Sequence, residues 1–413
     1  MIEINKYELK NGLRLIHSCD PTIQMATVNT LYDVGAKKEM PGKTGLAHLM
    51  EHLMFAGSRN VKNINEHIRR AGGSLNAFTD SDITNYYFTI PCQNIETALW
   101  IESDRMANLD VTKGKYNVQH KVVFEEYNQC YVNRPYGDLY SLMKKMHYGG
   151  THYSWTAIGI DGDDIQNIKY EDVIDFYQKY YGPNNAIISI CGNISFEESK
   201  RLVEKWFGDI PRIQVPPYKF DKKTISPEGN FMEVERDVPM NVLVKTYGMG
   251  RKNSDNARIC DAISDLLSNG DSSVLYKNLV KERQIFSNIS AGITPEMESG
   301  MFTVVVYFAD DMSFDDAEKY LNEELEKFVS TEIDTYSLEK IKNKFEVTTM
   351  MNMMDGGLRA KEMAIYELCG DANDINTEVA KYRSVTQKDV MDAAKQLFLK
   401  SNTSTLYYKK RGE

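Results

Sequence analysis

Two histidines and a glutamate in the stretch GLAHLMEHLMFAG, residues 45–57, have the types and the spacing to do chemistry. His48 and His52 are one helical turn apart, so both imidazoles could reach a single metal ion. Glu51 follows His48 by three residues and projects into the same space. The order H-x-x-E-H is the inverse of H-E-x-x-H, and both orders are signatures of zinc peptidases. We therefore predict a zinc ion bound by the two imidazoles, with the Glu51 carboxylate beside it.

This chemistry requires the stretch to be a helix, and the spacing of its apolar residues predicts one. Apolar side chains recur at i, i+3, i+4, i+7 and i+8, which is the stripe of an amphipathic helix: Leu46, Leu49, Met50, Leu53 and Met54. We expect Thr44 to cap its start and Gly57 to end it. A polar face opposite such a stripe is usually only solvated. The chain has just seven histidines, however, and two of them at ligand spacing favour the metal site.

A catalytic zinc site needs three protein ligands and one open position, so a third ligand must come from elsewhere. We expect it on another helix, predicted over residues 113–132, and choose Glu126 in the sequence QHKVVFEEYNQ. Glu125 and His120 are the alternatives from the residues alone. Gln119 lies two turns before Glu126 on the same face and could hydrogen-bond a metal ligand without binding the metal itself.

The predicted site implies a mechanism of peptide hydrolysis. Zinc lowers the pKa of its bound water towards about 7. Glu51 would take the proton as general base, the hydroxide would attack a peptide carbonyl, and Glu51 would return the proton to the leaving amine. Glu51 should not itself be a ligand, so mutation can separate its role from metal binding.

Length and composition narrow the class of protein. A chain of 413 residues is too long for one core, so two or more domains are expected. The net charge of −10 argues against a general nucleic-acid binder and against adsorption to anionic membranes. Six scattered cysteines form no C-x-x-C pair, which disfavours a structural zinc finger and suits a reducing compartment. We find neither a signal peptide in the sequence as given nor a membrane-spanning run, and expect the cytoplasm; a leader already removed would leave no trace.

The order of predicted elements repeats along the chain. Residues 208–230 contain four prolines among lysines and aspartates, which is typical of a linker. After it a strand, a helix at 257–267 and a strand pair at 287–308 recur, but this helix reads ARICDAISDLL and has no histidine. We predict an α+β fold of two homologous α/β-sandwich domains from internal duplication, each a mixed, mainly antiparallel sheet flanked by helices. Residues 1–212 form the zinc-binding catalytic domain, 213–232 the linker, and 233–413 a domain without the metal motif.

Three segments in this order resemble the pitrilysin (M16) family of metallopeptidases, which includes the mitochondrial processing peptidases: HLMEHLMFAGS, GGSLNAFTDSDITNYYF and KVVFEEY. The resemblance spans nearly the whole chain, and the length is similar to that of the short, two-domain members. It implies one zinc ion per chain, with His48, His52 and Glu126 as ligands and Glu51 as base, because the E-x6-E pattern of the family selects Glu126 over Glu125. It also implies that an extended substrate pairs with the edge of one strand, formed by Leu75, Asn76, Ala77, Phe78 and Thr79.

Two departures from the family pattern bear on activity. The leading glutamate of E-x6-E is Gln119 here, which keeps hydrogen bonding and loses a charge. Active relatives carry an arginine and a tyrosine in the second half, where this chain has Val280 and Ser287; Arg283 is out of register. The family works as a closed chamber of four such domains. The resemblance therefore implies a heterodimer in which this chain is the zinc-bearing, β-like subunit and the partner supplies the arginine and tyrosine, with a homodimer as the form of the isolated chain.

Three functions are compatible with these observations. The first is a zinc endopeptidase acting on peptides or unfolded segments in an enclosed chamber. The second is a non-catalytic scaffold of the same fold, as in the core subunits of respiratory complexes, and the third is a peptide-binding module that uses the edge strand. The intact His48, Glu51 and His52 favour the endopeptidase, since a scaffold needs none of them.

Overall fold

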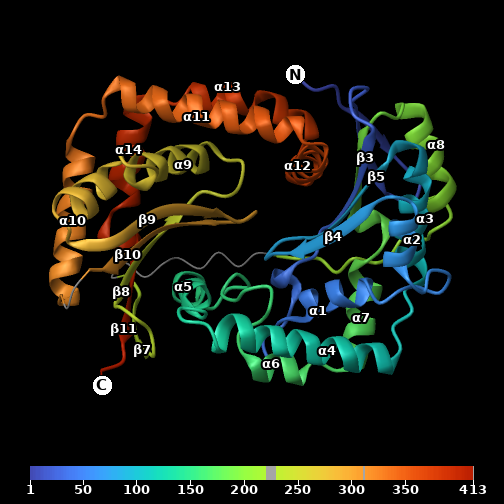
Figure 1. The fold of residues 1–413 in the computed structure, drawn as a ribbon, viewed down its shortest axis with the longest axis horizontal. Coiled ribbons are helices and arrows are strands. Elements are labelled where there is room, and N and C mark those ends of the chain that lie inside the picture. Colours follow the sequence, from blue (N-terminus) through green and yellow to red (C-terminus); the bar gives the residue numbers. More distant parts are fainter. Residues whose placement is uncertain (220–228, 310–311, 413) are drawn as a thin grey trace. The chain divides into compact units, whose positions relative to one another are not determined.

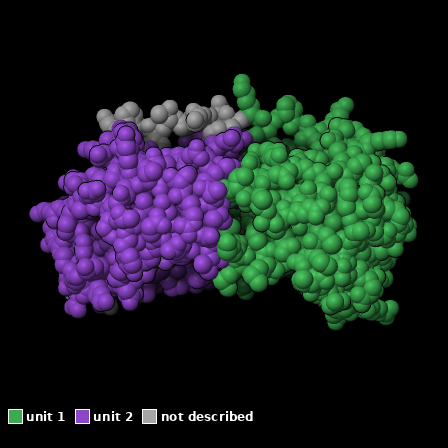
Figure 2. Space-filling view, turned by 90° about the horizontal axis from the view of Figure 1, so that it is seen from above, with its two compact units in different colours: residues 1–129, 155–219, 349–378 green, residues 130–154, 220–348, 379–413 purple. Residues whose placement is uncertain are grey.

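The computed structural model describes residues 1–219, 229–309 and 312–412. The chain divides into two compact units, coloured separately in Figure 2. Unit 1 consists of Met1–Gln129, Trp155–Lys219 and Thr349–Glu378, and unit 2 of Cys130–Ser154, Phe220–Thr348 and Val379–Glu413. Each unit is built on one sheet with helices against it (Figure 1), which confirms the predicted fold class.

The sheet of unit 1 has six strands in the order β1-β2-β6-β3-β5-β4. Their bounds are β1 Asn5–Glu8, β2 Arg14–Cys19, β3 Met25–Tyr32, β4 Ser74–Thr79, β5 Thr84–Pro91 and β6 Ala186–Gly192. Strands β2 and β6 are parallel and the other neighbours are antiparallel. Strand β6, with the sequence AIISICG, is buried along its whole length, as a continuous apolar run in a covered sheet predicts. Strand β4 is the last in the order and pairs only with β5.

Helices cover both faces of this sheet. They are α1 Leu46–Met54, α2 Ile64–Arg70, α3 Ile95–Asn108, α4 Lys113–Tyr127, α6 Gly162–Asn167, α7 Tyr170–Tyr180, α8 Phe196–Phe207 and α12 Gly356–Cys369. Helix α3 lies against the face that carries Tyr86, because the Arg105 guanidinium sits 4.3 Å from the centre of that ring. Helix α12 lies on the opposite face, where the Ser189 hydroxyl donates to the carbonyl of Ala360 at 2.6 Å.

The sheet of unit 2 has five strands in the order β7-β11-β8-β10-β9. Their bounds are β7 Phe231–Arg236, β8 Val242–Met249, β9 Phe286–Pro295, β10 Gly300–Phe308 and β11 Thr403–Lys410. Only β7 and β11 are parallel among these neighbours. The order and directions match those of β2-β6-β3-β5-β4 in unit 1, strand for strand. This is the repeat that internal duplication predicts.

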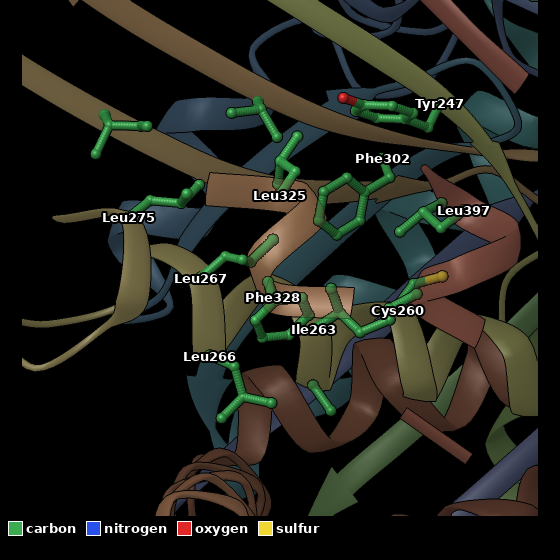
Figure 3. Packing of buried hydrophobic residues seen from close by; sticks show 14 of the residues in the cluster. Tyr247, Cys260, Ile263, Leu266, Leu267, Leu275, Phe302, Leu325, Phe328 and Leu397 are labelled. Atoms are coloured by element: carbon green, nitrogen blue, oxygen red, sulfur yellow. The ribbon is translucent and has the colours of Figure 1, made fainter. Parts of the chain in front are cut away.

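The helices of unit 2 enclose its core. They are α5 Leu139–Tyr148, α9 Asp255–Ser268, α10 Phe314–Ser330, α11 Thr335–Met354, α13 Glu378–Arg383 and α14 Gln387–Leu397; the last residues of α11 and the first of α13 belong to unit 1. Figure 3 shows Ile263 and Leu267 of α9 among Phe302 of β10, Phe328 of α10 and Leu397 of α14. Each of these side chains is buried, so the burial of apolar surface holds the helices on the sheet. Within the described ranges, no helix is both long and apolar enough to cross a membrane.

The predicted domain bounds, 1–212 and 233–413, differ from the two units. Helix α5 packs in unit 2, where Asp138 before it accepts hydrogen bonds from Arg236 and from the Tyr408 hydroxyl at 2.9 and 2.6 Å. Helix α12 packs in unit 1, where Arg359 pairs with Asp20 at 3.0 Å. Each half of the chain thus lends one helix to the sheet of the other half, because each sheet needs a cover on its second face. Part of the predicted linker, residues 220–228, lies outside the described residues, and its last two residues already belong to β7.

Candidate metal centre

Helix α1 forms where the apolar stripe predicts it. Leu46, Leu49, Met50, Leu53 and Met54 are all buried, so the polar residues are left on the other face. The predicted cap is wrong: Gly45, at φ 95°, precedes the helix, and the Thr44 hydroxyl donates instead to Asp164 at 2.6 Å.

The carboxylate of Glu39 caps α1 in place of Thr44. It accepts from the backbone N–H groups of Gly45 and Ala47, at 3.0 and 2.7 Å, and from the indole of Trp155 at 3.1 Å. Burial raises the pKa of Glu39 to about 8, although these hydrogen bonds favour its charged form. The sequence analysis missed Glu39, and no local pattern marks it, because it precedes the helix by an irregular turn and meets Trp155 only in the fold.

Helix α4 carries the third side chain. Thr112 caps it by accepting from the backbone of Lys115 at 3.2 Å, and the helix continues as a π-helical turn over Asn128–Val132. Two contacts tie it to α6 and to the residue after it: His120 Nε2 donates to the carbonyl of Ile165 at 2.8 Å, and the Tyr116 hydroxyl donates to that of Ile168 at 2.5 Å. His120, one alternative for the third ligand, is therefore engaged with backbone.

The two helices bring His48, His52 and Glu126 together. The Nε2 atoms of the two histidines are 3.3 Å apart. Glu126 Oε2 lies 3.4 Å from His52 Nε2, and Oε1 lies 3.9 Å from His48 Nε2. Among the residues the structure describes, this is the one set of three histidine, cysteine or acidic side chains close enough to share an ion. Glu125, the other alternative, is exposed and outside the set.

These distances fit a tetrahedral zinc ion. Two ligand atoms that are each about 2.0–2.1 Å from such an ion lie about 3.3–3.4 Å from one another. Two imidazole nitrogens and one carboxylate oxygen are also a ligand set that catalytic zinc sites use. The donor atoms therefore match zinc in chemistry, and two of the three separations match it in spacing, while the third, between His48 Nε2 and Glu126 Oε1, is longer at 3.9 Å.

The protonation states suit metal binding at neutral pH. Burial and the neighbouring His52 lower the pKa of His48 to about 4, so its imidazole is neutral. The hydrogen bond from His52 lowers the pKa of Glu126, which stays ionised. Burial acts to lower the pKa of His52, but hydrogen bonds with Glu126 and Gln119 raise it overall. Protonation of His52 would compete with binding of a metal ion, since only the neutral imidazole is a ligand.

The residues around the ligands are placed as follows. Gln119 reaches His52, as its position two turns before Glu126 predicts. No side chain supports His48 in the way that Gln119 supports His52: the Nδ1 atom of His48 is buried without a hydrogen-bond partner among the described residues. Glu51 is not in the ligand set; its Oε2 accepts from the Thr79 hydroxyl at 2.6 Å, and burial raises its pKa.

The strand predicted to bind substrate is β4, at the free edge of the sheet. Of the five residues 75–79, Thr79 contacts Glu51, and Asn76 turns its side-chain oxygen onto the N–H of Ala77 at 2.9 Å. Leu75 is half-buried. Phe78 lines a pocket of about 790 Å³ between the sheet and the start of α12, together with Met25, Tyr87, Met354 and Leu358.

Two family models match the chain. The model described as insulinase (peptidase family M16) matches residues 14–146, and the one described as the peptidase M16 inactive domain matches residues 167–345. The chain belongs to peptidase family M16. The first match contains His48, Glu51, His52 and Glu126, and the second contains none of these site residues.

Similar M16 proteins are named as proteases. The zinc protease PqqE of Helicobacter pylori is 26% identical over 97% of this chain and 91% of its own length. The probable mitochondrial-processing peptidase subunit beta of Schizosaccharomyces pombe is 28% identical over 49% of this chain and 44% of its own. A crystal structure of a protease from Helicobacter pylori superposes with a TM-score of 0.92 at 26% identity, covering 99% of this chain and all of that one. A peptidase M16 inactive domain from Pseudomonas fluorescens, 14% identical, shares the fold with a TM-score of 0.87 over 100% of this chain and 98% of that one.

The assignment of Val280 and Ser287 to the family's arginine and tyrosine positions stays a prediction, and the structure shows only where these residues lie. Val280 packs against the core of unit 2, and the Ser287 hydroxyl donates to the carbonyl of Tyr307 at 3.1 Å. Arg283 is 3.6 Å from Glu324 and lies over the ring of Tyr320. Arg283 is thus engaged within unit 2.

Proposed function

We propose that this chain is a zinc-dependent endopeptidase, with His48, His52 and Glu126 as the ligands of one zinc ion and Glu51 as the general base. The observation that carries the proposal is the convergence of two imidazole nitrogens and a carboxylate within 3.3–3.9 Å of one another. Membership in a family whose named relatives include zinc proteases supports it. Glu51 outside the ligand set supports a separate base.

The residues around the ion divide the chemistry between them. When bound, zinc supplies electrophilic activation of a water molecule and of the peptide carbonyl. Glu51 accepts the proton of the attacking water on its carboxylate and then delivers it to the leaving amine. The burial that raises the pKa of Glu51 makes the carboxylate a stronger base than an exposed one.

The substrate class follows from the free edge of β4. An extended peptide that pairs with residues 75–79 satisfies the unpaired backbone groups of this edge, with little demand on sequence. Its side chains alternate between the two faces of the sheet. One set points towards Glu51, and the other points towards the 790 Å³ pocket beside Phe78. Only unfolded segments or peptides can pair in this way, because a folded strand has its backbone already bonded.

We infer that a second M16-like subunit completes the enzyme and encloses the substrate. Val280 has no side-chain donor, the Ser287 hydroxyl already donates to the carbonyl of Tyr307, and Arg283 pairs with Glu324. One relative is itself named a beta subunit. In this proposal the chain is the zinc-bearing subunit of a heterodimer, and the isolated chain forms a homodimer with weak activity. A location in the cytoplasm stays a prediction.

The test is cleavage of an internally quenched unfolded peptide by the zinc-loaded chain, alone and with its M16-like partner. We expect cleavage to stop with a zinc chelator, to return with added zinc, and to fall by about 10²–10⁴-fold in Glu51→Gln. Glu125→Gln, a neighbouring exposed carboxylate, is the matched control and should leave the rate unchanged. Cleavage that survives both the chelator and Glu51→Gln would reject this mechanism.

A non-catalytic, peptide-binding subunit is the alternative. The match of residues 167–345 to a domain described as inactive favours it, as do Val280 and Ser287. This alternative predicts stoichiometric zinc and peptide binding without cleavage, even when the partner is present. The same assay therefore separates the two functions.

A further inference from the structure

We propose that Thr79 is the positioning residue of the general base, holding one oxygen of Glu51 so that the other, Oε1, receives the proton. The inference rests on the proposed function, because it assigns a task within the same site. It adds a residue that touches neither the ion nor the reacting water and acts through Glu51.

The contact itself is short and joins distant parts of unit 1. Thr79 Oγ1 lies 2.6 Å from Glu51 Oε2, and the two residues are 28 positions apart. The contact fixes a side chain of α1 to the last residue of β4. Hydrogen bonds to an ionised carboxylate are stronger than bonds between neutral groups. In the part of the chain that the structure describes, Glu51 Oε1 has no hydrogen-bond partner.

A neighbouring threonine sets the direction of this hydrogen bond. Thr84 Oγ1 is 3.5 Å from Thr79 Oγ1, and its own proton is donated to the carbonyl of Val34 at 2.8 Å. Thr84 can therefore only accept from Thr79. A hydroxyl has one proton to donate, and the much shorter distance to the carboxylate directs that of Thr79 to Glu51. Oε2 is thereby engaged on the strand side, which leaves Oε1, the oxygen without a hydrogen bond, as the freer proton acceptor.

Without this contact, Glu51 could become a metal ligand. Its position between His48 and His52 on one helical face lets the carboxylate swing towards their Nε2 atoms. A fourth protein ligand would close the open position that a catalytic site requires. Thr79 prevents this by holding the carboxylate against β4. Since β4 is also the strand that the proposal pairs with the peptide, the same strand would align both the substrate and the base.

The first experiment compares Thr79→Val with Thr79→Ser in the zinc-loaded chain with its partner. Valine keeps the volume and removes the hydroxyl, so we expect kcat to fall about tenfold to a hundredfold, with KM changed by less than twofold. Serine restores the hydroxyl and should restore most of kcat. Zinc affinity, measured by competition with a chromogenic chelator, should not fall in Thr79→Val. Thr303→Val, which removes a strand hydroxyl from β10 of unit 2, is the control and should leave all three quantities unchanged.

Two outcomes of this experiment would overturn the proposal. One is a Thr79→Val enzyme with wild-type kcat. The other is a loss of zinc affinity and a rise in KM that Thr79→Ser does not reverse, which would indicate a structural role of the strand residue.

A second experiment tests the contact without relying on activity. We would measure thermal midpoints of the metal-free wild type, Thr79→Val, Glu51→Ala and the double variant. If the hydroxyl acts on Glu51, the effect of Thr79→Val should largely vanish once Glu51 is alanine. Additive shifts would overturn the proposal. If the wild type itself cleaves nothing even with its partner, the proposed function fails, while this cycle still decides whether Thr79 holds Glu51.

Discussion

Helices α1 and α9 occupy equivalent places in the two units, yet their polar faces are built differently. Each follows the central strand of its sheet, β3 or β8, and each buries an apolar stripe. On α1, the Nε2 atoms of His48 and His52 point to one place, where Glu126 of α4 joins them. No protein cation neutralises this group of donors in the described part of the chain.

On α9, protein groups already satisfy the acidic side chains. Asp261 accepts a hydrogen bond from the Tyr382 hydroxyl at 3.0 Å. Asp265 is paired with the Lys344 ammonium at 3.0 Å and accepts from the amide of Asn269 at 2.6 Å. The polar face of α9 thus holds unit 2 together, and its charges are not left available to a ligand.

The comparison shows that two helices in equivalent positions of the fold differ in function because their polar side chains differ. The same order of strands supports a converging donor set in one unit and a closed hydrogen-bond network in the other. Duplication alone therefore predicts nothing about chemistry in the second unit. The test of this view is whether changes on α1 and α9 affect different properties.

The largest expected effect is on metal content when an α1 ligand is removed. His52→Ala takes away one of three ligands and leaves two, so we expect stoichiometric zinc binding to be lost. Asp265→Asn removes a carboxylate from the equivalent helix and should leave zinc content at one per chain. Elemental analysis after gel filtration measures both. An equal loss of zinc in the two variants would show that metal binding depends on both helices.

The next effect is on stability when the core beneath α9 is opened. Leu267 is fully buried in the unit 2 cluster, and Leu267→Ala should reduce the free energy of unfolding by about 2–5 kcal/mol. Zinc content should not change, because Leu267 belongs to the core of unit 2 and supplies no ligand atom. Chemical denaturation measures the change, and Leu399→Ala, at a side chain that is 46% exposed, is the control with little effect. A Leu267→Ala protein of unchanged stability would contradict the packing.

A smaller effect is expected from placing an acid at position 119, where the resemblance to the M16 family implies a glutamate. Gln119 hydrogen-bonds His52, and Gln119→Glu would make that imidazole a better donor to the metal, raising zinc affinity about tenfold to a hundredfold. Gln129→Glu adds the same charge at an exposed position and controls for long-range attraction. Competition with a chelator measures both variants. Equal gains in the two would mean that net charge, and no particular contact, governs affinity.

Features set by neighbouring residues could be predicted from the sequence, whereas contacts between residues far apart in the chain could not. The stripe of α1 and the meeting of His48, His52 and Glu126 follow from helical periodicity together with the family pattern. The cap by Glu39 and the bond between Thr79 and Glu51 join residues that no repeat or spacing connects.

The exchange of α5 and α12 between the two halves of the chain is another long-range feature that no sequence pattern predicts. An amphipathic pattern indicates that a helix has a buried face, but it does not say which sheet that face will cover. The compact units differ from the linear split at the linker for this reason, although the repeated order of strands was predicted.

The smallest expected effect is the pH dependence that Asp261 of α9 contributes to stability. Burial and the nearby Asp265 raise the pKa of Asp261 to about 6 from an ordinary value of 3.8. Between these two values the folded chain keeps a proton that the unfolded chain has lost, so this residue lowers stability as the pH rises from about 4 to about 6. Asp261→Asn cannot titrate and still accepts from Tyr382. As the pH falls from 6 to 4, wild type should therefore gain about 1–3 kcal/mol relative to Asp261→Asn in unfolding free energy. The difference is read from denaturation curves of both proteins at several pH values. A constant difference across this range would mean that Asp261 is already ionised in the folded chain, and that the polar face of α9 is more open to water than its contacts with Tyr382 indicate.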